Sequence, residues 1–249
     1  MFSQVKIFQS YEVMSTTAAD DIMKNINQTL LSSNKCTLGL ATGSTPRATY
    51  QNLLTLLSDK SVNLSNFYTV NLDEYYPIEQ SNPHSFHTEM TKRFWEPLHA
   101  ANPTFDVSHG YILNGEAPDA EIESKRYEDQ IKQLGGIDLQ ILGLGVNGHI
   151  AFNEPGSPRD SRTRKIEIAE ETRQINMKSF SGDEEKMPQF GLTMGIATIL
   201  EAKKIFLLVS GETKRPIYEQ LFQIQEPTPS IPASFLLQHS DVTVFTDIG

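Results

Sequence analysis

Apolar residues recur along this chain with two different spacings. From Met14 an apolar side chain returns at every fourth position as far as Leu30, which predicts an amphipathic helix. The same periodicity, with capping residues at segment ends, predicts further helices over 46–57, 86–95, 120–134, 187–200 and 213–222. Short apolar runs instead predict buried strands at 38–41, 67–72, 139–142, 205–209 and 242–246.

Strands and helices alternate for most of the chain. This order indicates right-handed crossovers and a mostly parallel central sheet with helices on both faces, so the expected fold class is an α/β three-layer sandwich. No repeat, low-complexity block or change of composition marks a linker, and we expect a single domain over residues 1–249. Segment 155–187 has no clear periodicity, and an irregular stretch of that length is typical of a lid or an insertion.

Composition narrows the functional classes. The net charge of −10 and the pI near 5.1 argue against a nucleic-acid surface and against a basic membrane patch. An anionic ligand would need a locally positive site or backbone N–H donors. Cys36 is the single cysteine, which excludes an intrachain disulfide, and the first residues do not resemble a secretory signal. We expect a cytoplasmic protein, a monomer or a small homo-oligomer.

The stretch GLGVNGHIAFNEPG at 143–156 follows a predicted strand and is rich in polar side chains. Its glycines allow tight turns close to a ligand, at the strand end where open α/β sheets bind ligands. His149 and Glu154 are near enough in sequence to pair as a base and its orienting carboxylate, while Asn147, Asn153 and Ser157 could assist. The alternative is a structural turn. The dinucleotide-binding glycine pattern is met only superficially, because Asn153-Glu154-Pro155-Gly156 interrupts any helix.

Three other strand ends carry candidate chemistry. The turn at 38–46 leads into a helix opened by Ser44 and Thr45, which is either a phosphate-binding turn or a plain capped helix. Asp73 and Glu74 follow the second strand, where a partly desolvated carboxylate can act as a base, although Asp73 could also be a cap for the adjoining segment. Lys214 lies in the first turn of a late helix, a position unfavourable for a cation unless an anion binds there.

His84 and His87 have a metal-like spacing in the segment SNPHSFH. No third ligand is evident nearby in the sequence. We therefore interpret Ser85 as a helix cap and both histidines as structural, and predict no metal site.

These motifs, in this order, resemble the glucosamine-6-phosphate deaminase (isomerase) family, whose relatives include the 6-phosphogluconolactonases. The resemblance rests on ATGSTP, NLDEYY, SNPHSFH, GVNGHIAFNEPGS, SRTR, GLTMGIATIL and IPASFLLQH, which run from about residue 38 to 238. It implies a Rossmann-like fold, no metal or organic cofactor, and a small sugar phosphate as the partner. The implied activity is conversion of glucosamine 6-phosphate and water to fructose 6-phosphate and ammonia. We assign such an enzyme to the hydrolases, as a deaminating isomerase.

The resemblance also implies roles for individual residues. Asp73 would move a proton between C2 and C1 of the sugar, and His149, oriented by Glu154 and Asn147, would assist ring opening. The phosphate would be held by Gly43, Ser44, Thr45, Lys178 and Lys214.

Four positions depart from the family pattern. Asn147 stands where some members have aspartate, and Lys178 falls where an arginine often completes the phosphate site. Pro158 and Ile166 occupy positions that carry serine and lysine in allosteric members, which predicts a non-allosteric enzyme. The alternatives are the same reaction on galactosamine 6-phosphate, a 6-phosphogluconolactonase, and a non-catalytic sugar-phosphate sensor.

Overall fold

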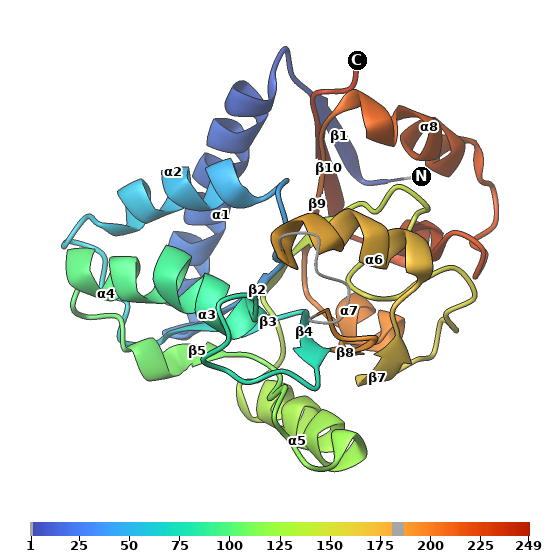
Figure 1. Cartoon of the computed structure of the whole chain (residues 1–249). Helices are drawn as coiled ribbons and strands as arrows, with labels where there is room; N and C mark the ends of the chain where they lie inside the picture. Colours follow the sequence, from blue (N-terminus) through green and yellow to red (C-terminus); the bar gives the residue numbers. More distant parts are fainter. Residues whose placement is uncertain (1, 181–186) are drawn as a thin grey trace.

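A computed structural model describes residues 2–180 and 187–249 (Figure 1). Its main sheet has the order β1-β10-β9-β6-β2-β3-β5, and every neighbouring pair of strands is parallel. The strands are β1 (Gln4–Ile7), β2 (Cys36–Leu40), β3 (Phe67–Asn71), β5 (Gly110–Tyr111), β6 (Leu139–Gly143), β9 (Ile205–Val209) and β10 (Val242–Thr246). The predicted α/β class with a mostly parallel central sheet is confirmed.

Helices cover both faces of this sheet. One face packs on α1 (Tyr11–Ser33), α2 (Arg47–Leu57), α3 (Phe86–Met90), the π-helical turn η1 (Thr91–Trp95) and α4 (Glu96–Ala101). The other packs on α5 (Ala120–Gln133), α7 (Ile196–Leu200), α8 (Arg215–Gln223) and the 3-10 helix η6 (Pro232–Gln238). Neighbours in one strand, such as Ile141 and Leu142, therefore enter opposite hydrophobic layers. None of the described helices is long and apolar enough to cross a membrane.

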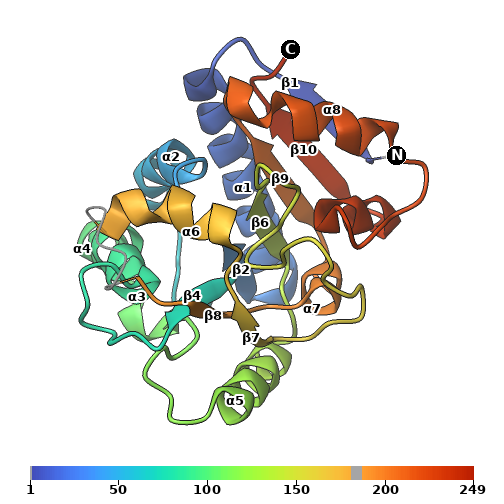
Figure 2. The same cartoon turned by 45° about the vertical axis from the view of Figure 1, so that its right-hand side comes forward.

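A small antiparallel sheet lies beside the main one, in the order β4-β8-β7. It consists of β4 (Asp73–Tyr76), β8 (Phe190–Thr193) and β7 (Arg164–Glu167), and Figure 2 shows it below α6 (Glu170–Asn176). A separate apolar cluster that includes Tyr75, Phe152 and Phe180 packs here. The segment predicted to be irregular thus contains a strand, a helix and the 3-10 turn η3 (Met177–Phe180).

The predicted helix over 187–200 is wrong in its first half. Residues Phe190–Thr193 form β8 between β4 and β7, and only Ile196–Leu200 are helical. Gly191 packs so closely that an added Cβ would lie 2.7 Å from the ring of Phe152, and the Thr193 hydroxyl accepts the Phe152 N–H at 3.2 Å. These partners are distant in sequence, so local periodicity did not reveal them.

Candidate active site

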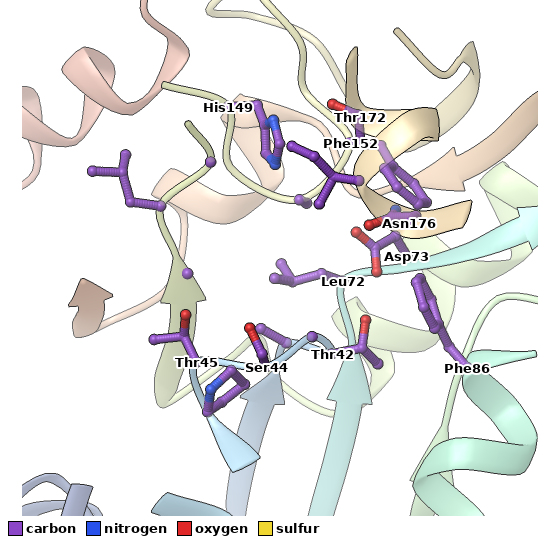
Figure 3. A pocket seen from close by; sticks show the side chains of 18 of the residues that line it. Thr42, Ser44, Thr45, Leu72, Asp73, Phe86, His149, Phe152, Thr172 and Asn176 are labelled. Atoms are coloured by element: carbon purple, nitrogen blue, oxygen red, sulfur yellow. The ribbon is translucent and has the colours of Figure 1, made fainter. Parts of the chain in front are cut away.

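The carboxyl ends of the adjacent strands β6, β2 and β3 bring three loops to one pocket. The phosphate-type turn Gly43–Thr45, Asp73, His149 and Lys214 all line it. Figure 3 shows Ser44 and Thr45 on one side of the cavity, with His149 and Asp73 on the other. The structure therefore gathers residues that the sequence places in four separate segments.

The turn before α2 has its backbone N–H groups available for an anion. Gly43 has φ of 99°, a left-handed conformation that favours glycine, and no described residue accepts a hydrogen bond from the amides of Gly43, Ser44 or Thr45. The Tyr11 hydroxyl holds the turn, lying 3.1 Å and 3.0 Å from the carbonyl oxygens of Ser44 and Thr45. The alternative of a helix capped by Ser44 or Thr45 is wrong, because among the described residues the first-turn N–H of Ala48 is accepted instead by the Tyr11 hydroxyl, at 3.1 Å. Both hydroxyls can therefore face a ligand.

Lys214 supplies a positive charge to the pocket from the 3-10 turn η5 (Glu212–Lys214). Burial lowers the pKa of its ammonium group, and the negative charge of Glu171 offsets this lowering only in part. Among the described residues no carboxylate forms an ion pair with it. A bound anion would supply the missing partner.

Asp73 and Glu74 are adjacent in β4 but have different surroundings. The Glu74 carboxylate accepts hydrogen bonds from the backbone N–H groups of Tyr75, Phe86 and His87 at 2.8, 2.9 and 2.8 Å. Burial raises its pKa to about 7, while those three donors act in the opposite direction. Glu74 thus anchors the start of α3, the helix that Ser85 caps as predicted.

Asp73 is only 6% exposed, and its carboxyl accepts no hydrogen bond from any described residue. Burial, reinforced by the charge of Glu74, raises its pKa to about 8. The rings of Phe86 and Phe152 lie near it in the pocket wall (Figure 3). A desolvated carboxyl without a structural partner is suited to proton transfer near neutral pH.

His149 is oriented by two side chains of its own loop. Its Nδ1 lies 2.8 Å from Asn147 Oδ1 and 3.5 Å from Glu154 Oε2, and Asn147 Nδ2 donates to the same Glu154 oxygen at 2.9 Å. Although burial raises the pKa of Glu154, hydrogen bonds and charge from His149, Thr172 and Asn147 bring it below its ordinary value. An ionised carboxylate only accepts, so the Asn147 carbonyl must face the imidazole. Neutral His149 therefore carries its proton on Nδ1 and has Nε2 as an acceptor.

Two glycines make this arrangement possible. A Cβ on Gly145 would collide with the His149 ring, so this position needs a glycine. Gly148 has φ of 84°, which lets the chain turn immediately before the histidine. The Gly145 N–H then donates to the His149 carbonyl at 2.9 Å and closes the turn.

Comparison with known proteins agrees with this geometry. A family model described as glucosamine-6-phosphate isomerases/6-phosphogluconolactonase matches residues 9–245. The chain belongs to this family. The glucosamine-6-phosphate deaminase of Shouchella clausii is 42% identical over 239 residues, 96% of this chain and 92% of the relative. Glucosamine-6-phosphate deaminase 1 of Bacillus subtilis is 41% identical over 239 residues, 96% of this chain and 94% of the relative.

Solved structures place the fold in the same isomerase/lactonase family. A structure described as a monomeric glucosamine-6-phosphate deaminase superposes with a TM-score of 0.90 at 40% identity, covering 98% of this chain and 97% of that one. A 6-phosphogluconolactonase from Shewanella baltica gives a TM-score of 0.74 at 18% identity, covering 98% and 96%. The second likeness shows the fold alone.

One expectation about enzyme class needs correction. The assignment to the hydrolases is wrong, because the relatives are named deaminases and the family description names isomerases. The expectation of an enzyme stands.

Several polar residues of the family-like loops do not enter the pocket. The Asn153 amide donates to the carbonyl oxygens of Ile150 and Met194 at 3.0 and 2.8 Å, and Arg164 donates to Asn153 and Ser157. These contacts hold the loop, so Asn153 and Ser157 have structural surroundings. The side chain of Lys178 lies outside the described part of the structure, so its predicted phosphate role stays a prediction. Within the described ranges, no three His, Cys, Asp or Glu side chains group as metal ligands would.

Helix α6 contributes two polar pocket residues that the sequence pattern did not reveal. Thr172 and Asn176 line the cavity and are four residues apart, one helical turn. The acidic start and polar face of 170–176 could have indicated a helix. Its side-chain partners were not visible from local sequence.

Proposed function

We propose that this chain catalyses the conversion of glucosamine 6-phosphate and water to fructose 6-phosphate and ammonia. The observation that carries the proposal is the buried Asp73 carboxyl, without a described hydrogen-bond donor, in one pocket with an anion-binding turn and an oriented imidazole. The names of relatives about 40% identical over nearly the whole chain support the same substrate.

In this proposal the phosphoryl group anchors the sugar. The amides of Gly43, Ser44 and Thr45 and the ammonium of Lys214 bind its oxygens, because backbone N–H groups and a partly buried cation both favour a dianion. Anchoring one end of the sugar limits where the other end can lie. Much of the rate then comes from positioning.

His149 and Asp73 would act in succession. Ring opening takes the proton from O1 and returns one to O5, which suits a neutral imidazole whose Nε2 is an acceptor. The open-chain aldehyde acidifies the C2 proton, and ionised Asp73 takes this proton from C2 and delivers it to C1. In the same sequence O1 gains the proton that the ammonium group loses, so that C1 carries a hydroxyl and C2 becomes an iminium carbon. Water then adds at C2 and ammonia leaves.

An ammonia-release assay tests the proposal. The parent, Asp73→Asn and the matched control Asp20→Asn would each be given glucosamine 6-phosphate and galactosamine 6-phosphate. Asp20 is exposed on α1 and does not line the pocket, so its variant makes the same chemical change outside the site. We expect release by the parent and by Asp20→Asn, and a loss of about a hundredfold to ten-thousandfold in Asp73→Asn.

Other results of this assay would each change the proposal in a different way. Equal release by all three proteins would remove Asp73 from the role of base. Release from galactosamine 6-phosphate alone would transfer the proposal to that epimer. If neither sugar released ammonia but the parent hydrolysed 6-phosphogluconolactone, the lactonase alternative would replace it.

A further inference from the structure

A side chain of helix α6 is hydrogen-bonded to the group that orients His149. The Thr172 hydroxyl donates to Glu154 Oε1 at 2.6 Å, and only 4% of Thr172 is exposed. Glu154 belongs to the loop after β6, eighteen residues earlier in the chain. The contact therefore joins two segments that β7 separates.

The two oxygens of Glu154 have different partners. Oε1 accepts from Thr172, whereas Oε2 accepts from Asn147 and faces His149 Nδ1 at 3.5 Å. With one oxygen held by α6, the carboxylate cannot rotate without breaking a short hydrogen bond in a half-buried place. We propose that Thr172 is a positioning residue, which fixes the orientation of Glu154 and through it the tautomer and direction of the His149 imidazole.

The same helix contributes to the pocket that holds the other reacting group. One turn after Thr172, Asn176 lines the same pocket as Asp73 (Figure 3). Between them Ile175 lines the pocket while remaining 46% exposed. Helix α6 is therefore a wall of the site, and the position of this wall determines whether the hydroxyl reaches Glu154. The catalytic meaning of this link rests on the proposed function, whereas its effect on the imidazole does not.

A pair of substitutions separates the hydroxyl from the packing of residue 172. Thr172→Val keeps the branched shape and removes the donor, and Thr172→Ser keeps the donor and removes a methyl group. A hydrogen bond to a charged group corresponds to about tenfold to a hundredfold in rate. We expect kcat for ammonia release to fall by that factor in Thr172→Val and to return to within about threefold of the parent in Thr172→Ser. The Kd for inorganic phosphate should stay unchanged in both.

Three results would overturn the assignment. If Thr172→Val kept the parent kcat, the hydroxyl would not position the relay. If Thr172→Ser were as slow as Thr172→Val, or if phosphate affinity fell in step with kcat, residue 172 would act by packing alone.

A spectroscopic test does not depend on turnover. Long-range ¹H–¹⁵N correlation spectra distinguish the two neutral imidazole tautomers, and His149→Gln identifies the His149 signals among those of the six histidines. We expect the Nδ1–H tautomer in the parent and in Thr172→Ser, and a mixture in Thr172→Val. An unchanged tautomer in Thr172→Val would refute the positioning role even in an active enzyme. Conversely, the parent could release no ammonia while the tautomer still changed between the parent and Thr172→Val. That result would refute the proposed function alone.

Discussion

The substitution Asp73→Asn should stabilise the protein, and should do so more as the pH rises. The Asp73 carboxyl is buried, and its pKa is about 8 in the folded chain against 3.8 ordinarily. The native state therefore binds this proton more tightly than the unfolded state does. Between those two values the unfolded state binds fewer protons, so the free energy of unfolding falls with rising pH. Asparagine cannot ionise and removes this dependence.

The size of this stability difference depends on the pH interval between the two pKa values of Asp73. Each pH unit inside it changes stability by about 1.4 kcal/mol. From about pH 5 to about pH 8 the parent should lose up to about 4 kcal/mol relative to Asp73→Asn. For a chain of this length, 4 kcal/mol corresponds to a difference in Tm of about 8–16 °C. A buried acid that destabilises the fold in this way is compatible with selection for catalysis rather than for stability.

Urea unfolding of both proteins at the two pH values measures this difference. The quantity compared is the change in the free energy of unfolding between the two pH values. This comparison cancels any constant effect of the substitution and the titration of groups that both proteins share. Asp20→Asn serves as the control and should follow the parent. Parallel pH dependence in the parent and Asp73→Asn would show that Asp73 ionises as an exposed acid does, and the argument for a desolvated base would fail.

Three further predictions concern separate parts of the molecule. Lys214→Ala should raise KM for glucosamine 6-phosphate about tenfold to a hundredfold with little change in kcat, because it removes a charged phosphate contact. An unchanged KM in steady-state assays would contradict this prediction. Gly145→Ala should lower kcat at least tenfold while inorganic phosphate still binds, since the new Cβ displaces the His149 ring; parent-like kcat would mean that the loop adapts. Cys36 should resist a thiol reagent in the native protein and react once urea unfolds it, because burial raises its pKa to about 12. Rapid reaction of the thiol reagent with the native protein, without urea, would contradict the burial of Cys36.

Much of the fold can be predicted from local sequence. Secondary structure is predicted clearly where burial is regular, because both faces of the sheet and one face of the helix are buried. This applies to the apolar runs of β2, β3, β6, β9 and β10 and to the four-residue period of α1. The strand ends then marked the loops with unusual chemistry. Gly43–Thr45, Asp73, His149 and Lys214 were found this way, and they do share one pocket.

Local sequence failed where a distant partner decides the structure. Residues 190–193 have an apolar pattern that also fits a helix, and they become β8 because β4 and β7 pair with both of their edges. Asp73 was expected in a turn for the same reason, since the strand that pairs with β4 lies more than a hundred residues later.

The amino-acid sequence by itself determined five strands of the main sheet, most of the helices between them and the identity of the reactive side chains, because burial and turn chemistry depend on neighbouring residues. Only the tertiary structure decided which of them meet. It separated the anchored Glu74 from Asp73, whose carboxyl has no hydrogen-bond donor in the described part of the chain, and it turned the Asn147 amide so that an imidazole tautomer is selected. It also brought Thr172 to Glu154. Such hydrogen bonds depend on distances between segments, which no spacing along one strand or helix encodes.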